Sequence, residues 1–206
     1  MNVFFKIISV IFHPLLISTY GMLWMLNLTV FSLFPFQWQV LAIGGTTLFT
    51  CIIPLLPTYI LMRQGVVSDL QMQKKEQRTM PYVFSIVGYS FWTVFLSRTL
   101  QLPMTIAVMG IGSVLALVVI MIVNLKWKIS AHLCGMGSLF GFVSGLSYVM
   151  AKNPIGLLAV LLCLSALVAL ARIELKAHTP LQTLAGFVVG FVCVFGSCFL
   201  MISYLL

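Results

Sequence analysis

The stretch VLAIGGTTLFTCIIPLLPTYILM, residues 40–62, contains no charged side chain over 23 residues. An α-helix needs about 20 apolar residues to cross roughly 30 Å of hydrocarbon. A soluble protein would have to bury such a run completely, and a membrane β-barrel shows short segments of alternating hydropathy instead. The stretch therefore predicts a transmembrane helix and makes the lipid bilayer the expected solvent of the chain.

The composition of the whole chain points the same way. Of its 206 residues, 62% are hydrophobic and 7% are charged, and the mean hydropathy is +1.17. We expect an all-α, polytopic bundle of about six to seven transmembrane helices, which forms a single integral membrane domain over residues 1–206. The expected spans are 7–30, 39–61, 82–97, 103–125, 133–150, 155–171 and 182–205. Pro14, Pro54 and Pro57 in the first two spans predict kinks rather than breaks.

Polar residues gather on the loops of one membrane face. If the spans alternate in direction, the N-terminus and residues 62–81, 126–132 and 172–181 share one side. All three acidic residues fall there, with two of the three histidines and nine of the eleven Lys and Arg residues. Those nine are Lys6, Arg63, Lys74, Lys75, Arg78, Lys126, Lys128, Arg172 and Lys176. Because basic residues at helix ends also anchor spans and set topology, the cations alone leave both a functional and an anchoring interpretation open.

Three of these loops, residues 68–82, 126–132 and 171–182, combine several cations, two histidines and hydroxyl groups. They contain no carboxylate pair, cysteine pair or His-x-x-x-His of the kind that binds a metal, so we expect neither a metal nor a cofactor. Cations beside histidines are typical of phosphate recognition. The last two loops also lead into helices, whose N-termini favour bound anions. The net charge of +8 favours membrane lipids as partners rather than nucleic acid.

Two short motifs carry a resemblance to a known family. Arg172, five residues and then His178 resemble the third motif of the type 2 phosphatidic acid phosphatase (PAP2) superfamily, S-R-x5-H-x3-D. Ser130-Ala131-His132 resembles its second motif, P-S-G-H. The motifs stand in the family's order, and the 45 residues between the two histidines leave room for two membrane crossings. Such a hairpin returns both histidines to the same membrane face.

The resemblance covers roughly residues 62–200 and implies a PAP2-like core in residues 62–206, preceded by two N-terminal spans in residues 1–61. The family's lipid phosphatases suggest a bacterial inner membrane with the active face toward the periplasm. The excess of cations on that face favours the cytoplasm instead. His13 in the first span is interpreted as a helix-kink or interface residue, with a functional role as the alternative.

The resemblance implies an integral membrane phosphatase that hydrolyses a lipid phosphate or a polyprenyl diphosphate without a metal. His178 would attack phosphorus and form a phosphohistidine. His132 would protonate the leaving oxygen and then activate water. The phosphoryl oxygens would be held by Arg172 and Ser130, with Arg78 and Lys75 as stand-ins for the family's first motif, K-x6-R-P, which the chain does not match.

Departures from the family pattern keep a second function open. Gln182 stands where the family has an Asp that accepts a hydrogen bond from the nucleophilic histidine; an amide oxygen can accept too, but it carries no charge. Thr179 and Gln182, with Pro180 between them, also form a helix capping box, so both roles of Gln182 stay open. Ala171, Ile129 and Ala131 replace the family's Ser, Pro and Gly. The alternative function is a catalytically degenerate PAP2-like protein that binds or carries anionic lipid without turnover.

Overall fold

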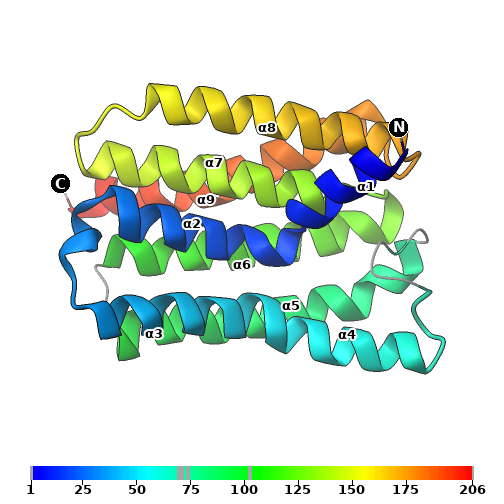
Figure 1. The fold of residues 1–206 in the computed structure, drawn as a ribbon, viewed down its shortest axis with the longest axis horizontal. Helices are drawn as coiled ribbons and strands as arrows, with labels where there is room; N and C mark the ends of the chain where they lie inside the picture. Colours follow the sequence, from blue (N-terminus) through cyan, green and yellow to red (C-terminus); the bar gives the residue numbers. More distant parts are fainter. Residues whose placement is uncertain (1, 69–71, 73–74, 102–103, 206) are drawn as a thin grey trace.

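The computed structural model describes residues 2–68, 72, 75–101 and 104–205, and the elements in these ranges are all helices (Figure 1). The first four α-helices are α1 (Asn2–Ile11), α2 (Pro14–Leu28), α3 (Phe36–Thr47) and α4 (Ile53–Arg63). They are followed by α5 (Thr79–Val94), α6 (Met104–Lys126), α7 (Ala131–Val149), α8 (Ile155–Glu174) and α9 (Pro180–Leu205). Short 3-10 turns cover Val30–Leu33 and Lys75–Arg78, and π-helical turns cover Leu48–Ile52 and Phe95–Thr99.

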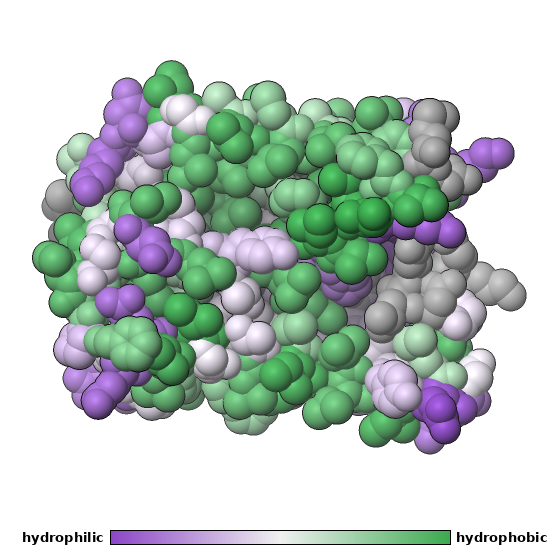
Figure 2. Space-filling model, in the orientation of Figure 1, coloured by the Kyte–Doolittle hydropathy of each residue, from purple (hydrophilic) through white to green (hydrophobic). Residues whose placement is uncertain are grey.

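Most of these helices are long and apolar enough to cross a membrane, which confirms the expected helical membrane bundle. In the described residues, five segments meet this criterion, and α1 with α2 forms a sixth if the bent pair is one span. The five are Phe36–Arg63, Lys75–Thr99, Ile106–Lys126, Ile155–Glu174 and Pro180–Leu200. Figure 2 shows the result as a largely hydrophobic surface between more hydrophilic ends.

The remaining expected span, residues 133–150, forms α7 but does not belong to this set. This helix packs against α2, α6, α8 and α9, and eleven of its residues are buried, including three glycines and His132. Because protein rather than lipid surrounds α7, the helix tolerates small and polar residues that a lipid-facing helix would not.

Proline acts differently in the two expected spans for which the sequence predicts kinks. Pro54 lacks an N–H group, and the helix that runs from α3 into α4 widens there into a π-turn, with the Ile53 N–H donating to the Leu48 carbonyl. The helix stays continuous from Phe36 to Arg63, so neither Pro54 nor Pro57 breaks it, as expected. The expectation for Pro14 is wrong, because Pro14 is the first residue of α2 and the chain bends by 57° between α1 and α2. His13 before it is extended, as residues before proline prefer.

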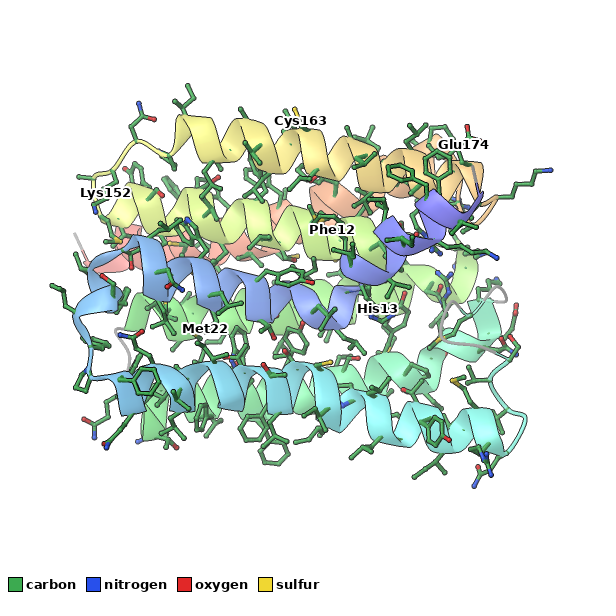
Figure 3. All side chains as sticks on the ribbon, in the orientation of Figure 1. Phe12, His13, Met22, Lys152, Cys163 and Glu174 are labelled. Atoms are coloured by element: carbon green, nitrogen blue, oxygen red, sulfur yellow. The ribbon has the colours of Figure 1, made fainter. Side chains whose placement is uncertain are left out.

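The loops that the sequence assigns to one membrane face do share one end of the bundle. Figure 1 shows the start of α1, the ends of α4, α6 and α8 and the starts of α5, α7 and α9 at one end of the bundle, and the end of α9 at the other. Figure 3 shows the two ends of the bundle along α8: Lys152, which precedes this helix, and Glu174, its last residue, lie at opposite ends of the bundle. Residues distant in sequence can therefore meet at the N-terminal end.

Glycines let α7 and α9 approach each other closely. A Cβ atom at Gly190 of α9 would collide with the Cys134 carbonyl oxygen of α7, and one at Gly137 of α7 would collide with the Phe187 carbonyl oxygen of α9. At the polar end, the Ser130 N–H donates to the Gln182 carbonyl at 3.2 Å. The N-termini of the two helices are thus fixed side by side.

We predict that Gly190→Ala lowers the free energy of unfolding by about 1–3 kcal/mol, because the new methyl group must push the α7 backbone away. Gly196→Ala on the same helix is the matched control, since a Cβ atom there meets nothing within 4 Å. Its effect should stay within about 0.5 kcal/mol. Unfolding of both variants in detergent micelles measures the difference, and equal stabilities would contradict the assigned packing.

Candidate functional site

A cavity of about 130 Å³ lies between α2, α4, α5, α6 and α7, beneath the polar loops. Its charged and imidazole side chains are His13, Arg78, His132, Arg172 and His178. Further along the bundle its wall is apolar, with hydroxyl groups such as those of Ser18, Ser85 and Ser113. Among the described residues that line the cavity there is no carboxylate. The cavity therefore presents positive charge at one end and apolar surface at the other.

The cavity also reaches the side of the bundle. Figure 2 shows a recessed hydrophilic patch between α1–α2 and α4, at the place where Figure 3 labels His13. His13 is half-buried and lines the cavity. An amphiphilic molecule in the bilayer could thus meet the cavity from the apolar flank of the protein as well as from its polar end.

Two helix ends hold His178 in place. At the end of α8, the N–H groups of Ala177 and His178 both donate to the Arg172 carbonyl, at 3.0 and 3.2 Å. At the start of α9, Thr179 and Gln182 form the predicted capping box: the Thr179 N–H donates to Gln182 Oε1 at 3.1 Å, and the Gln182 N–H donates to Thr179 Oγ1 at 3.4 Å. The residues between Arg172 and His178 therefore form the end of α8 and the turn that leads into the cap of α9.

Hydrogen bonds define the protonation of the His178 ring. Its Nδ1 atom lies 3.2 Å from the Lys128 carbonyl oxygen and 3.2 Å from Gln182 Oε1. A backbone carbonyl can only accept, so Nδ1 carries the hydrogen and the neutral ring has its lone pair on Nε2. Gln182 Oε1 thus caps α9 and contacts the His178 ring at once; the capping role is confirmed, and catalytic support stays a prediction.

The surroundings of His178 disfavour its charged form. Burial is the main cause and, with the positive charges of Arg78, Arg172 and Lys128, lowers the pKa of His178 from 6.5 to about 3; the hydrogen bond to Gln182 acts in the opposite direction. At neutral pH the imidazole is uncharged, which is the form in which its Nε2 lone pair is available for bonding.

His132, in the first turn of α7, is tied to the N-terminal helix. Its Nε2 atom lies 3.1 Å from the Ser9 carbonyl oxygen of α1, so Nε2 carries a hydrogen. Its ring packs edge-to-face against His13, with 5.4 Å between the ring centroids. The side chain of His13 also caps α2 by accepting from the Leu15 N–H at 3.4 Å. His13 therefore has the predicted structural role at a helix bend and also lies in the site.

Two arginines supply the positive charge of the cavity. Arg172 belongs to the last turn of α8 and is 1% exposed, and Arg78 precedes α5 and is 5% exposed. Arg78 Nε donates to the Met72 carbonyl at 3.0 Å, and its Nη1 donates to the Ile129 carbonyl at 3.1 Å. These bonds hold the Arg78 guanidinium against the loop that leads into α7.

The other two residues predicted to hold phosphate lie outside the cavity wall. Ser130 is the N-cap of α7, and its Oγ accepts from the Leu133 N–H at 3.4 Å. Lys75 Nζ donates to the carbonyls of Leu125 and Lys126, at 3.0 and 3.3 Å, at the end of α6. Both side chains thus stabilise helix ends, and a phosphate contact from either stays a prediction.

Sequence reasoning misses the backbone acceptors of the site. The Ser9 and Lys128 carbonyls fix the tautomers of the two histidines, and every residue carries such a group, so no side-chain pattern could reveal them. It also misses Tyr82, which lines the cavity. The available signal is its position four residues after Arg78, on the same face of a helical segment.

No protein-family model matches the chain, and no curated protein or solved structure matches it. In the part of the chain that the structure describes, no group of three or more His, Cys, Asp or Glu side chains is placed to hold a metal ion. The side chains of the cavity are therefore the observations that indicate a function.

We predict that His178 makes the fold acid-sensitive. The pKa of His178 is about 3 in the folded protein, whereas an exposed histidine of the unfolded chain has its ordinary value of 6.5. The unfolded chain therefore binds the proton more tightly. The contribution of the neutral His178 ring to the free energy of unfolding is fully present above pH 6.5. It declines as pH falls toward 3, by up to about 1.4 kcal/mol per pH unit. His178→Gln should flatten the fall in melting temperature between pH 7 and pH 5 in micelles. Parallel curves for the variant and the wild type would contradict the assigned burial.

Proposed function

We propose that the protein is an integral membrane phosphatase of PAP2 type, which hydrolyses a lipid phosphate or a polyprenyl diphosphate through a phosphohistidine. One observation carries the proposal. The Nδ1 hydrogen of His178 faces two oxygen acceptors, which leaves the Nε2 lone pair of an uncharged ring in a cavity also lined by two arginines and a second histidine. This is the arrangement that nucleophilic attack on phosphorus needs.

In the first half of the reaction, the Nε2 lone pair of His178 attacks phosphorus, and the bond from phosphorus to the leaving oxygen breaks. The leaving oxygen is the ester oxygen of a lipid phosphate or the bridging oxygen of a diphosphate. The electron pair of that bond stays on the leaving oxygen, which takes a proton from His132. Because the Ser9 carbonyl holds the hydrogen on His132 Nε2, the proton that moves is the one carried by Nδ1 of a protonated ring. Burial and the charge of Arg172 lower the pKa of His132 well below its ordinary value, so the protonated ring depends on the negative phosphate beside it. Arg172 and Arg78 stabilise the charge on the phosphoryl oxygens.

In the second half, His132 takes a proton from a water molecule as the water oxygen attacks phosphorus. The phosphorus–nitrogen bond breaks, its electron pair returns to His178 Nε2, and orthophosphate leaves. Gln182 Oε1 and the Lys128 carbonyl accept the Nδ1 hydrogen of His178 throughout, and so they stabilise the positive ring of the intermediate. All the steps use side chains and backbone carbonyls of the chain, together with water.

The shape of the cavity supports a lipid substrate. Its charged end suits a phosphate, whereas its wall continues along the bundle with Leu117, Ile120 and Pro54 and reaches the apolar flank of the protein. A phosphate ester with a hydrocarbon tail satisfies both ends. The bacterial inner membrane as location, and the side of that membrane which the cavity faces, remain predictions from the family resemblance and from the cation distribution.

The first test is phosphate release by the purified protein in detergent with EDTA present. The panel contains phosphatidic acid, phosphatidylglycerophosphate and undecaprenyl diphosphate. We expect turnover that persists in EDTA and falls by at least about 10³-fold in His178→Asn, because the nucleophile is lost. Lys152→Asn, which removes a cation at the opposite end of the bundle, is the control and should retain turnover.

A second function has one observation in its favour. The Gln182 amide carries no charge, so the phosphohistidine receives less stabilisation than a carboxylate would provide. A protein that binds lipid phosphate without turnover would show saturable binding of the same lipids and no phosphate release. That outcome would replace the phosphatase proposal with the binding protein.

We also predict that Gln182→Ala lowers kcat about 10- to 100-fold, because one of the two acceptors that hold the His178 ring is removed. Thr179→Ala is the matched control. It removes the hydroxyl that accepts from the Gln182 N–H and leaves Gln182 Oε1 beside His178. If both variants lose kcat equally, Gln182 acts through the cap of α9 alone and the orienting role is wrong.

A further inference from the structure

Tyr82 carries a buried hydroxyl group that the fold does not use. The residue lies in the first turns of α5, is 7% exposed and lines the cavity. Its hydroxyl oxygen is buried and has no hydrogen-bond partner in the described residues. Buried polar groups of native proteins nearly always have partners, and an orphaned one costs about 1–3 kcal/mol. A hydroxyl kept at that cost in a cavity indicates a ligand.

The neighbours of the hydroxyl indicate which ligand. The Arg78 guanidinium is close to the hydroxyl and acts on it through its charge and through a loose side-chain contact that falls short of a well-formed hydrogen bond; Cys134 of α7 is another neighbour. Two N–H groups of Arg78 are occupied by backbone carbonyls, and a guanidinium has five. An oxyanion between Tyr82 and Arg78 would accept from the phenol and from the remaining donors of the arginine.

We propose that Tyr82 is a phosphate-binding residue whose hydroxyl donates a hydrogen bond to a phosphoryl oxygen held by Arg78. The inference rests on the proposed phosphatase function. It adds a neutral hydrogen-bond donor to the charged arginine donors of the site. The hydroxyl strengthens its bond as negative charge gathers on the phosphoryl oxygens, so it stabilises the transition state more than the ground state. No bond to Tyr82 forms or breaks.

Tyr89 provides a matched comparison on the same helix. It is also 7% exposed and also lines the cavity, but its hydroxyl oxygen accepts from Ser18 Oγ at 2.8 Å. Replacing either tyrosine by phenylalanine removes one oxygen atom and leaves the ring. At Tyr89 the change breaks a hydrogen bond of the fold, whereas at Tyr82 it removes a hydroxyl that has no well-formed hydrogen bond in the fold.

The experiment compares Tyr82→Phe and Tyr89→Phe with the wild type in detergent micelles. Three quantities are measured: the melting temperature without ligand, the Kd of orthophosphate from its thermal shift, and kcat/KM on the lipid substrate. We expect Tyr82→Phe to melt no lower than the wild type, to bind orthophosphate about 10-fold more weakly and to lose about 100-fold in kcat/KM. Tyr89→Phe should melt lower and keep the wild-type Kd.

Other outcomes separate the two proposals. If the wild type binds and releases phosphate and Tyr82→Phe matches it in both, Tyr82 is not a phosphate ligand and the phosphatase proposal stands. If Tyr82→Phe melts lower or does not fold, its hydroxyl has a structural partner and the inference is overturned. If the wild type neither binds orthophosphate nor releases it from lipid, the proposed function fails, and the role of Tyr82 fails with it.

Discussion

The close approach of α7 and α9 is the constraint on which the site depends. His132 lies in the first turn of α7, and His178 lies just before α9, so the distance between the two histidines is set by how the two helix starts are aligned. Glycines at the crossing allow backbone contact, and the bond from the Ser130 N–H to the Gln182 carbonyl aligns the ends. With any larger residue at the crossing, α9 would move away from α7 and take His178 with it.

Charge and burial together explain why glutamine suits position 182. The cavity contains Arg78 and Arg172, and a carboxylate beside His178 Nδ1 would favour the imidazolium, whose nitrogens carry no free lone pair. Gln182 Oε1 accepts from the ring and leaves it neutral, with its lone pair on Nε2. In the proposed reaction the ring becomes positive, and the Lys128 carbonyl then accepts from Nδ1 together with Gln182.

Much of the fold could be predicted from the sequence because apolar runs such as residues 40–62 have only one stable environment. The convergence of the loops follows from counting crossings, and the α9 cap follows from local chemistry at Thr179 and Gln182. From the sequence alone, a break at Pro14 could not be distinguished from a kink, because proline is compatible both with the start of a new helix and with a bend inside one helix. The cavity walls also escaped prediction: Tyr82 follows Arg78 on one helical face, but whether that face borders a cavity depends on how the helices pack together.

The moderate apolarity of α7 has a consequence for biogenesis. A translocon releases helices into lipid according to their hydropathy, and α7, with its buried glycines and histidine, is poorly suited to solitary release. Its main partner, α9, is synthesised only after α8, so α7 has to wait while a full helical hairpin emerges. During that interval α2 and α6, which are already in place and touch α7 in the final bundle, can shelter it. The order of the helices in the chain thus provides an assembly platform for a helix that is not apolar enough to count as a span by itself.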